Sequence, residues 1–245
     1  MRSISAVTFD LWDTLVKEVP GGPEKVAQIR VDSISAVLEG AGIAHTAAEV
    51  RSAYDKCGMF LELTWSKRRD LPVREHVLFL LNCVDAKLAS RLKGHEFDEI
   101  EKAYAEGLLK NPPRLLPGAK EALRSVRSRG YHMGLISNTG RTPGYALKMI
   151  LAEMGILEQF DVTSFSNELL VRKPAETIFR VTLERLRIPA KAAVHIGDNA
   201  EQDVEGARRV GMRAIHLIAE GAKPSKAADA STASLDNVLE LIEGL

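Results

Sequence analysis

The chain has 245 residues, and its 33 basic and 33 acidic side chains give a formal charge of zero at neutral pH. This balance argues against a nucleic-acid partner and against charge-driven attachment to an anionic membrane. Apolar residues make up 45% and charged residues 27% of the chain, as in soluble globular proteins, and no apolar run approaches the roughly 20 residues that span a bilayer.

The first predicted element is a buried strand over residues 4–10, which ends in Asp10. A long helical block follows, because the apolar side chains between residues 17 and 112 recur at helical spacing. Its predicted helices span residues 24–42, 46–65, 74–92 and 97–110. Two prolines, Pro112 and Pro113, end this block, since proline cannot continue a helix.

Beyond residue 113, short apolar runs alternate with helical patterns. The runs predict buried strands over residues 132–138, 161–167, 192–198 and 213–219. The helical patterns cover residues 118–130, 145–155, 175–187, 203–211 and 235–245. This alternation predicts an α/β fold, with residues 1–16 and 113–245 forming a parallel sheet core flanked by helices. Residues 17–112 are then an inserted α-helical subdomain, and residues 221–232 are predicted to form a flexible surface loop.

Polar residues of distinctive types stand at or just beyond the ends of four predicted strands. They are Asp10 after the first strand, Ser137 and Asn138 after the second, Lys173 after the third, and Asp198 and Asp203 after the fourth. Ligands of parallel α/β sheets bind outside the carboxyl ends of the strands, so these side chains are expected to converge. Alone, each has a simpler explanation: Asp203 suits a helix N-cap and Lys173 a solvated loop. Together and in this order, they predict a reaction centre.

The motifs FDLWDTL, LISN, RKP and HIGDNAEQDVEGA resemble, in this order, those of the haloacid dehalogenase-like (HAD) superfamily. The resemblance covers the whole chain. It implies a Rossmann-like core and identifies the helical block as a cap domain inserted after the first motif. It also implies a Mg²⁺-dependent phosphatase that hydrolyses a small phosphorylated metabolite through an aspartyl-phosphate intermediate.

The same resemblance implies a role for each charged motif residue. Asp10 would be the attacking nucleophile and also a metal ligand, with Asp198 and the backbone carbonyl of Trp12 as the other protein ligands of Mg²⁺. Lys173 would neutralise phosphate charge and orient Asp10. Asp203 would hold a metal-bound water or Lys173. A phosphate ester repels an attacking carboxylate, and the two cations would remove that barrier.

Ser137 and the backbone amide of Asn138 are expected to hold the phosphate oxygens, with Trp12 beside the substrate.

The first motif departs from the family pattern. The phosphatases of the superfamily carry a second aspartate two residues after the nucleophile, and this aspartate protonates the leaving oxygen. Trp12 occupies that place here, and Asp13 comes one position later. Alternation along an extended segment predicts that Trp12 shares the face of Asp10 while Asp13 points away.

Three readings of this departure stay open. In the first, the chain is a phosphatase in which Asp13, a cap residue or water replaces the missing acid. In the second, it is a 2-haloacid dehalogenase, because a halide leaves without a proton. In the third, it is a catalytically weak phosphate- or metal-binding regulatory protein. The intact Gly197-Asp198 strand end favours the phosphatase, since the dehalogenases of the superfamily need no metal.

The remaining features predict a cytoplasmic protein. The N-terminal segment lacks the organisation of a secretory signal, and Cys57 and Cys83 show no disulfide or metal-type spacing. His195 and His216 lie in apolar strand patterns and are predicted as core residues. The expected partner is a small phosphorylated molecule, with no nucleic acid and no membrane, and the chain is expected to be a monomer or homodimer.

Overall fold

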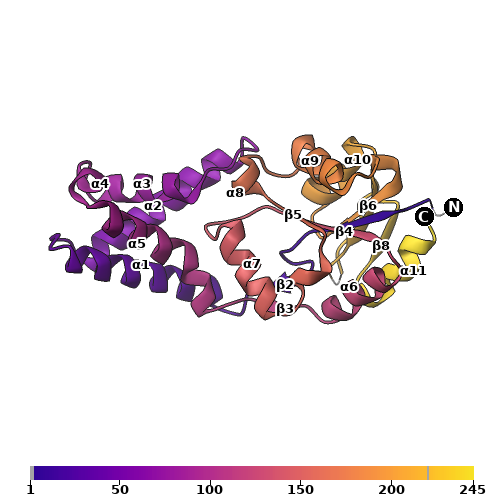
Figure 1. Cartoon of the computed structure of the whole chain (residues 1–245), viewed down its shortest axis with the longest axis horizontal. Coiled ribbons are helices and arrows are strands. Elements are labelled where there is room, and N and C mark those ends of the chain that lie inside the picture. Colours follow the sequence, from indigo (N-terminus) through magenta and orange to yellow (C-terminus); the bar gives the residue numbers. More distant parts are fainter. Residues whose placement is uncertain (1–2, 220) are drawn as a thin grey trace. The chain divides into compact units, whose positions relative to one another are not determined.

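The computed structural model describes residues 3–219 and 221–245, which form two compact units (Figure 1). The first, the α/β unit, contains the described residues of 1–17, 114–138 and 151–245. The second, the helical unit, contains residues 18–113 and 139–150. Residues 139–150, which the sequence pattern assigned to the core, therefore pack with the helical unit instead.

The α/β unit is built on one parallel sheet of six strands. In sheet order they are β5 (Val162–Phe165), β4 (His132–Ser137), β1 (Ala6–Phe9), β6 (Ala193–Gly197), β7 (Arg213–Leu217) and β8 (Ala230–Thr232). The chain adds β4 and β5 on one side of β1, and the later strands on the other. Strand order thus reverses at β1, which is where the ligand sites of such sheets lie.

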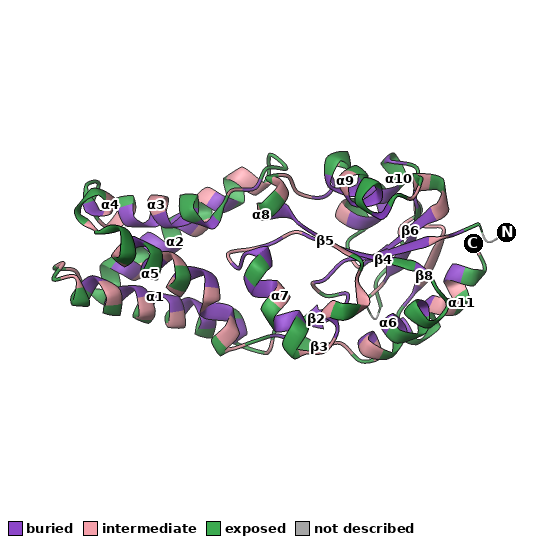
Figure 2. Cartoon of the chain, viewed as in Figure 1, coloured by how far each residue is buried: buried purple, intermediate pink, exposed green. Residues whose placement is uncertain are grey.

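Helices cover both faces of this sheet. Figure 1 shows α9 (Glu176–Leu186) and α10 (Gly206–Arg209) on one face, and α6 (Ala119–Ser128) and α11 (Val238–Glu243) on the other. The unit also contains β2 (Val16–Lys17), paired antiparallel with β3 (Arg114–Leu115), and the short helix α8 (Ser166–Leu169). Because both faces are covered, β1, β4, β6 and β7 are buried almost throughout (Figure 2) and read as continuous apolar runs, whereas β5 and β8 at the sheet edges are only partly buried.

One strand contradicts the prediction for residues 221–232. That segment was expected to be a loop throughout, but its last three residues form β8, which pairs in parallel with β7. The sequence Ala-Ser-Thr has no apolar run that would predict a strand. Its conformation comes from pairing at the sheet edge, and such tertiary pairing commonly overrides weak local preference.

The helical unit consists of helices around their own apolar core. Its elements are α1 (Gly22–Gly40), α2 (Ala47–Trp65), α3 (Val73–Val84), α4 (Leu88–Arg91), α5 (Gly94–Ala105) and the first part of α7 (Gly144–Glu153). A capping box starts α2, in which Thr46 and Glu49 satisfy each other's backbone amides. Within the described ranges, no helix combines the length and apolarity needed to cross a bilayer.

The predicted helix over residues 74–92 is two helices. Asp85 stands between them in an extended conformation, and its carboxylate accepts a hydrogen bond from the amide of Lys87 at 2.8 Å. An aspartate that bonds the backbone two residues ahead favours a turn over helix continuation. The long apolar pattern is therefore interrupted at Asp85. Both cysteines are free thiols, as predicted, and Cys57 lies in the core of the helical unit.

Two arginines attach residues 139–150 to the helices. The guanidinium of Arg141 lies 3.7 Å from the centre of the Tyr54 ring and donates to the Tyr54 carbonyl at 2.8 Å. Arg30, which is buried, donates to the hydroxyl of Thr142 at 2.7 Å. These contacts give the physical reason why this segment belongs to the helical unit, since cation–π stacking and hydrogen bonds from buried guanidinium groups both stabilise packing.

The buried His76 is expected to make the stability of the helical unit depend on pH. Its side chain is fully buried on α3, and neither ring nitrogen has a hydrogen-bond partner among the described residues. Burial lowers the pKa of the imidazole from 6.5 to about 4; Asp70 opposes this shift and Arg141 adds to it. The folded chain therefore keeps His76 neutral in a pH range where the unfolded chain protonates it.

We expect the free energy of unfolding to fall by about 3 kcal/mol as the pH drops from about 6.5 to about 4, and His76→Leu to remove this part of the slope. Denaturant titrations should follow the fluorescence of Trp65 in a Trp12→Phe background, because these are the two tryptophans of the chain. His95→Gln is the control, since His95 is exposed on α5. An unchanged slope in His76→Leu would contradict the assignment.

Candidate active site

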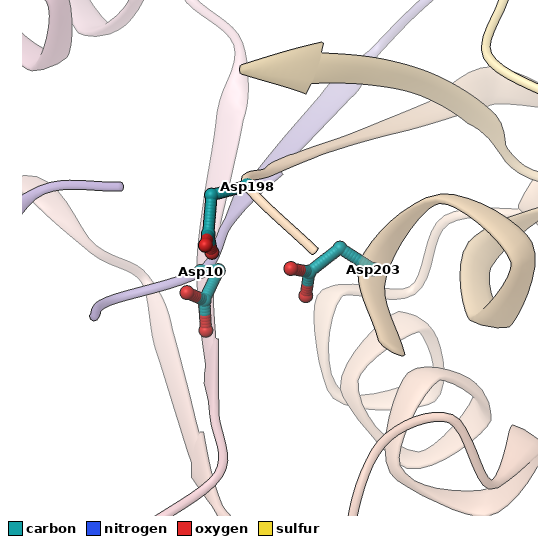
Figure 3. A group of neighbouring side chains, drawn as sticks. All are labelled: Asp10, Asp198 and Asp203. Carbon is teal, nitrogen blue, oxygen red and sulfur yellow. The ribbon is translucent and has the colours of Figure 1, made fainter. Parts of the chain in front are cut away.

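The carboxyl ends of β1, β4 and β6 bring most of the predicted site residues into one pocket of the α/β unit. Its volume is about 220 Å³. The residues that line it are Asp10, Trp12, Asp13, Asn138, Arg172, Lys173, Asp198, Asn199, Gln202 and Asp203. Figure 3 shows the carboxyl groups of Asp10 and Asp198 close together, with that of Asp203 directed toward them from its helical turn. The strand-end pattern therefore predicted a true spatial cluster.

A buried lysine links two of these carboxylates. The ammonium of Lys173 contacts Oδ1 of Asp10 and lies 2.5 Å from Oδ1 of Asp203. All three side chains are at least nine-tenths buried. Burial by itself lowers the pKa of Lys173, but the charges of Asp10 and Asp203 outweigh it and raise the pKa above its usual value. Lys173 is therefore a buried cation held at Asp10, and the solvated-loop explanation for it is wrong.

Asp203 is positioned by the turn that follows β6. It lies in a π-helical turn, Ala200–Glu205, whose N-cap is Asn199: the Asn199 side chain accepts hydrogen bonds from the amides of Glu201 and Gln202. Asp203 is thus not the N-cap that its sequence position allowed. Its Oδ2 instead accepts from the amide of Asn199 at 3.0 Å, and its Oδ1 faces Lys173. π-Helical turns of this kind are frequent at functional sites.

The glycine before Asp198 makes room for Asp203. A Cβ atom on Gly197 would lie 2.3 Å from Cγ and 2.5 Å from Cβ of Asp203. We therefore expect Gly197→Ala to displace Asp203 from Lys173 and to reduce the melting temperature. Gly40→Ala is the matched control, because no atom outside its own helix and chain neighbours lies within 4 Å of a Cβ added there. Equal melting temperatures of the two variants would contradict this account.

Burial and the crowding of negative charge shift the pKa of two of the carboxyl groups. Burial, together with the charges of Asp203 and Asp198, raises the pKa of Asp10 from 3.8 to about 7, although Lys173 opposes the shift. Burial and the charges of Asp203 and Asp13 raise the pKa of Asp198 to about 6. Asp203 differs: burial raises its pKa, but Lys173 and His195 outweigh burial and lower the pKa below its usual value.

The donor set fits a hard divalent cation. One oxygen from each of Asp10, Asp198 and Asp203 lies within 4.8 Å of the others. Lys173 engages Asp10 and Asp203 through their Oδ1 atoms, whereas the hydroxyl of Thr14 faces Oδ2 of Asp10 and Oδ1 of Asp198 at 3.4 and 3.5 Å. Oδ2 of Asp10 and Oδ1 of Asp198 therefore both lie near the Thr14 hydroxyl, and neither is the oxygen that Lys173 bonds. Oxygen ligands with few carboxylates are what Mg²⁺ prefers, and a cation there would favour their ionised forms.

Trp12 and Asp13 both line the pocket, which corrects one expectation. Alternation predicted that Asp13 would point away, but the extended segment ends at this residue. Asp13 has φ of 54°, and its amide donates to the Val16 carbonyl at 2.8 Å, so the chain turns here. The side chain is 58% exposed, 3.7 Å from the ammonium of Lys17, and its charge acts on Asp198. Asp13 is therefore a carboxylate at the pocket, beside Trp12.

Asn138 and Ser137 differ in what their side chains do. The amide of Asn138 accepts from the backbone N–H of Lys173 at 2.8 Å and donates to Gln202 at 2.8 Å. These hydrogen bonds hold the loop at Lys173 in place. Because they occupy the side chain of Asn138, its backbone is the part left to contact a ligand. Ser137 is fully buried at the end of β4, with its hydroxyl 3.4 Å from the Asn138 carbonyl.

Three residues that line the pocket were not predicted. They are Arg172, Asn199 and Gln202, and each lies next to or between motif residues.

The two strand histidines are buried, as predicted, and both contact site elements. His216 Nε2 lies 2.8 Å from the Asp198 carbonyl, and its Nδ1 accepts from the Ser225 amide at 3.0 Å. His195 Nε2 lies 3.1 Å from Oδ1 of Asp203. Burial lowers the pKa of His195, which favours the neutral ring. These histidines are therefore part of the scaffold behind the pocket.

Known proteins similar to this chain are hydrolases of one family. Residues 4–211 match the family model of the haloacid dehalogenase-like hydrolases. The mouse haloacid dehalogenase-like hydrolase domain-containing protein 3 is 26% identical over 98% of this chain and 91% of its own length. A HAD phosphatase from Thermococcus onnurineus matches over 98% of both chains, with 27% identity and a TM-score of 0.63. A 2-haloacid dehalogenase from Pseudomonas syringae pv. Tomato DC3000 matches over 98% of both chains at 20% identity and a TM-score of 0.67, a likeness of fold alone.

Proposed function

The chain belongs to the haloacid dehalogenase-like hydrolase family, and on this premise we propose that it is a Mg²⁺-dependent phosphatase of a small phosphorylated metabolite. The observation that carries the proposal is the arrangement of Asp10, Asp198 and Asp203 around the single ammonium of Lys173. This cluster holds more negative charge than Lys173 neutralises, so it suits a dication and a phosphoryl group together. The likeness to a HAD phosphatase over the whole chain supports it.

Asp10 is the nucleophile in this proposal. Its carboxylate oxygen forms a bond to phosphorus while the bond from phosphorus to the ester oxygen breaks, which leaves an aspartyl-phosphate. Water then attacks that phosphorus, and inorganic phosphate and the free carboxylate are formed. Lys173 holds Asp10 and neutralises phosphoryl charge, and Ser137 with the backbone amide of Asn138 contacts the phosphoryl oxygens. Asp10, Asp198 and the Trp12 carbonyl would hold Mg²⁺, which would supply charge neutralisation at the transferring group.

The helical unit is, in this proposal, the cap that selects the substrate. Its core is separate from that of the α/β unit, which supports an independent role in recognition. Caps of this kind exclude water from the reacting group, which protects a reactive intermediate. The identity of the metabolite then depends on residues of this unit.

Phosphate release from p-nitrophenyl phosphate tests the proposal. The purified chain is expected to release inorganic phosphate in MgCl₂. In EDTA it is expected to lose about nine-tenths of this activity or more, because the ion that neutralises phosphoryl charge is removed. Re-addition of Mg²⁺ should restore the rate. Activity that survives chelation would overturn the assignment of the metal, and no release with any divalent cation would overturn the phosphatase.

Trp12 favours a second candidate, a 2-haloacid dehalogenase. An indole at the pocket replaces the usual acid, and a halide leaves a carbon atom without a proton. Against it stands Asp198, because a carboxylate nucleophile gains nothing from a second carboxylate beside it unless a cation is present. Chloride release from 2-chloropropionate in EDTA separates the candidates: it is expected to be absent, and its presence would make the dehalogenase the function.

Asp13 replaces the missing acid in the phosphatase proposal. Asp13→Asn is expected to lower kcat for an alkyl phosphate by about 100-fold, because an alkoxide leaves poorly without a proton. For p-nitrophenyl phosphate the change should stay within about threefold, because nitrophenolate needs no proton. The double variant Trp12→Asp/Asp13→Asn is expected to recover the alkyl phosphate rate. Equal losses on both substrates would show that Asp13 is not the acid.

A further inference from the structure

A continuous chain of buried hydrogen bonds extends behind the pocket from β1 to the nucleophile. It starts at Thr8, whose hydroxyl lies 2.8 Å from Nδ1 of His195 on the neighbouring strand β6. Nε2 of His195 lies 3.1 Å from Oδ1 of Asp203, and the same oxygen lies 2.5 Å from the Lys173 ammonium. Lys173 in turn contacts Asp10. Thr8 and His195 are almost completely buried, so water does not compete for these bonds.

The partners of His195 fix its tautomer. Asp203 is ionised beside Lys173, so its Oδ1 can only accept, and Nε2 of His195 must carry the proton. Nδ1 is then an acceptor for the hydroxyl of Thr8, whose alternative acceptor, the Val194 carbonyl, lies farther away at 3.4 Å. The direction of donation is therefore the same at each step from Thr8 to Asp203. The Phe179 ring packs against the imidazole nearly at a right angle, with the ring centres 5.2 Å apart.

Asp10 and Asp203 compete for a single ammonium. A carboxylate that accepts several hydrogen bonds spreads its charge among them and attracts each donor less strongly. Asp203 accepts from the Asn199 amide and from His195 in addition to Lys173. Without the His195 donor, Oδ1 of Asp203 would accept from Lys173 but no longer from His195, and it would attract the ammonium more strongly. The ammonium would then shift toward Asp203 and away from the attacking carboxylate.

We propose that His195, oriented by Thr8, is a positioning residue for the nucleophile: by donating to Asp203 it keeps Lys173 directed at Asp10. No proton moves along this chain during the reaction, since its role is to set geometry and charge. The proposal rests on the proposed function, in which Asp10 attacks phosphorus. It also explains why a polar residue stands at the middle of a strand whose other side chains are apolar.

The test compares His195→Phe, which keeps the ring but removes both nitrogens, with His195→Gln, whose amide N–H can still reach Asp203. His195→Phe is expected to lower kcat for p-nitrophenyl phosphate by about 10- to 100-fold with KM changed by less than about threefold. His195→Gln is expected to recover most of that loss. Equal kcat values in wild type and His195→Phe would overturn the proposal.

Thr182→Val is the control for Thr8→Val. Both hydroxyls are fully buried in the α/β unit and make a side-chain bond of 2.8 Å, but the Thr182 hydroxyl bonds Ser164 and the Ile178 carbonyl, neither of which belongs to the chain just described. Thr8→Val is expected to lower kcat several-fold, on the order of 3- to 10-fold, and Thr182→Val to leave it unchanged. In the His195→Phe background, Thr8→Val should have no further effect on kcat. Equal effects of the two threonine variants would contradict the proposal.

One readout does not depend on turnover. Proton–nitrogen correlation spectra of the imidazole rings, in which the His195 signals are identified by their loss in His195→Phe, are expected to show the ring protonated at Nε2 alone. Asp203→Asn should change this pattern. Protonation at Nδ1 would overturn the proposal even if phosphatase activity is found. If no activity is found, the proposed function fails, and the tautomer still decides whether the chain of donors exists.

Discussion

Asp10→Asn is expected to lower phosphate release by about 10⁴-fold or more, because an amide oxygen is a poor nucleophile and cannot form the aspartyl-phosphate. The same change is expected to raise the melting temperature of the metal-free protein at pH 8, or to leave it equal. Burial and two neighbouring carboxylates raise the pKa of Asp10 to about 7, so the folded state disfavours its ionised form. Replacement by a neutral residue removes that cost.

The combination of lost activity and retained or increased stability distinguishes this account from misfolding. Turnover and thermal unfolding should be measured on the same preparation in EDTA and in MgCl₂. Asp32→Asn, which removes one exposed carboxylate from α1, is the control for loss of charge and should change neither. After acid quench, phosphate from a labelled substrate should remain bound to the wild type and be absent from Asp10→Asn. A lower melting temperature, or bound label in the variant, would contradict the assignment.

The parallel sheet was predictable because both of its faces are covered. Each of the five apolar runs corresponds to a strand, with bounds shifted by a few residues at most. β8 was not predictable, because Ala-Ser-Thr has no apolar pattern and is a strand only through its pairing with β7. The assignment of residues 139–150 to the helical unit was not predictable either. It depends on the contacts of Arg30 and Arg141, which join segments far apart in the chain.

The site shows the same division between local and long-range information. Asp10, Lys173 and Asp198 could be placed because strand ends of a parallel sheet meet at one edge. Asp13 could not, because a single turn with positive φ cancels the alternation on which its direction was predicted. The apolar neighbours of His195 predicted a core residue, and its side chain is indeed buried. Its contact with Asp203 depends on the turn after β6, which carries no periodic pattern.

Lys173→Met should have the second large effect, on both activity and stability. Turnover is expected to fall by about 10³-fold, because the charge that faces the phosphoryl group and orients Asp10 is removed. The free energy of unfolding near neutral pH is expected to fall by about 3 to 5 kcal/mol, the usual cost of leaving a buried partner charge uncompensated. Lys110→Met is the control, because Lys110 is exposed and its ammonium donates to the Ser33 hydroxyl at 3.2 Å.

The pH dependence of stability gives the sharper test of this variant. In the wild type Lys173 opposes the rise of the Asp10 pKa and lowers that of Asp203. Without it, burial and mutual repulsion raise both pKa values above that of the unfolded chain, so the folded state binds more protons. The melting temperature of Lys173→Met in EDTA should therefore fall steeply as the pH rises from about 4 to about 8, and more steeply than that of the wild type. Parallel pH profiles would show that Lys173 does not compensate these two carboxylates, and the charge arrangement from which phosphoryl transfer was inferred would then have to be abandoned.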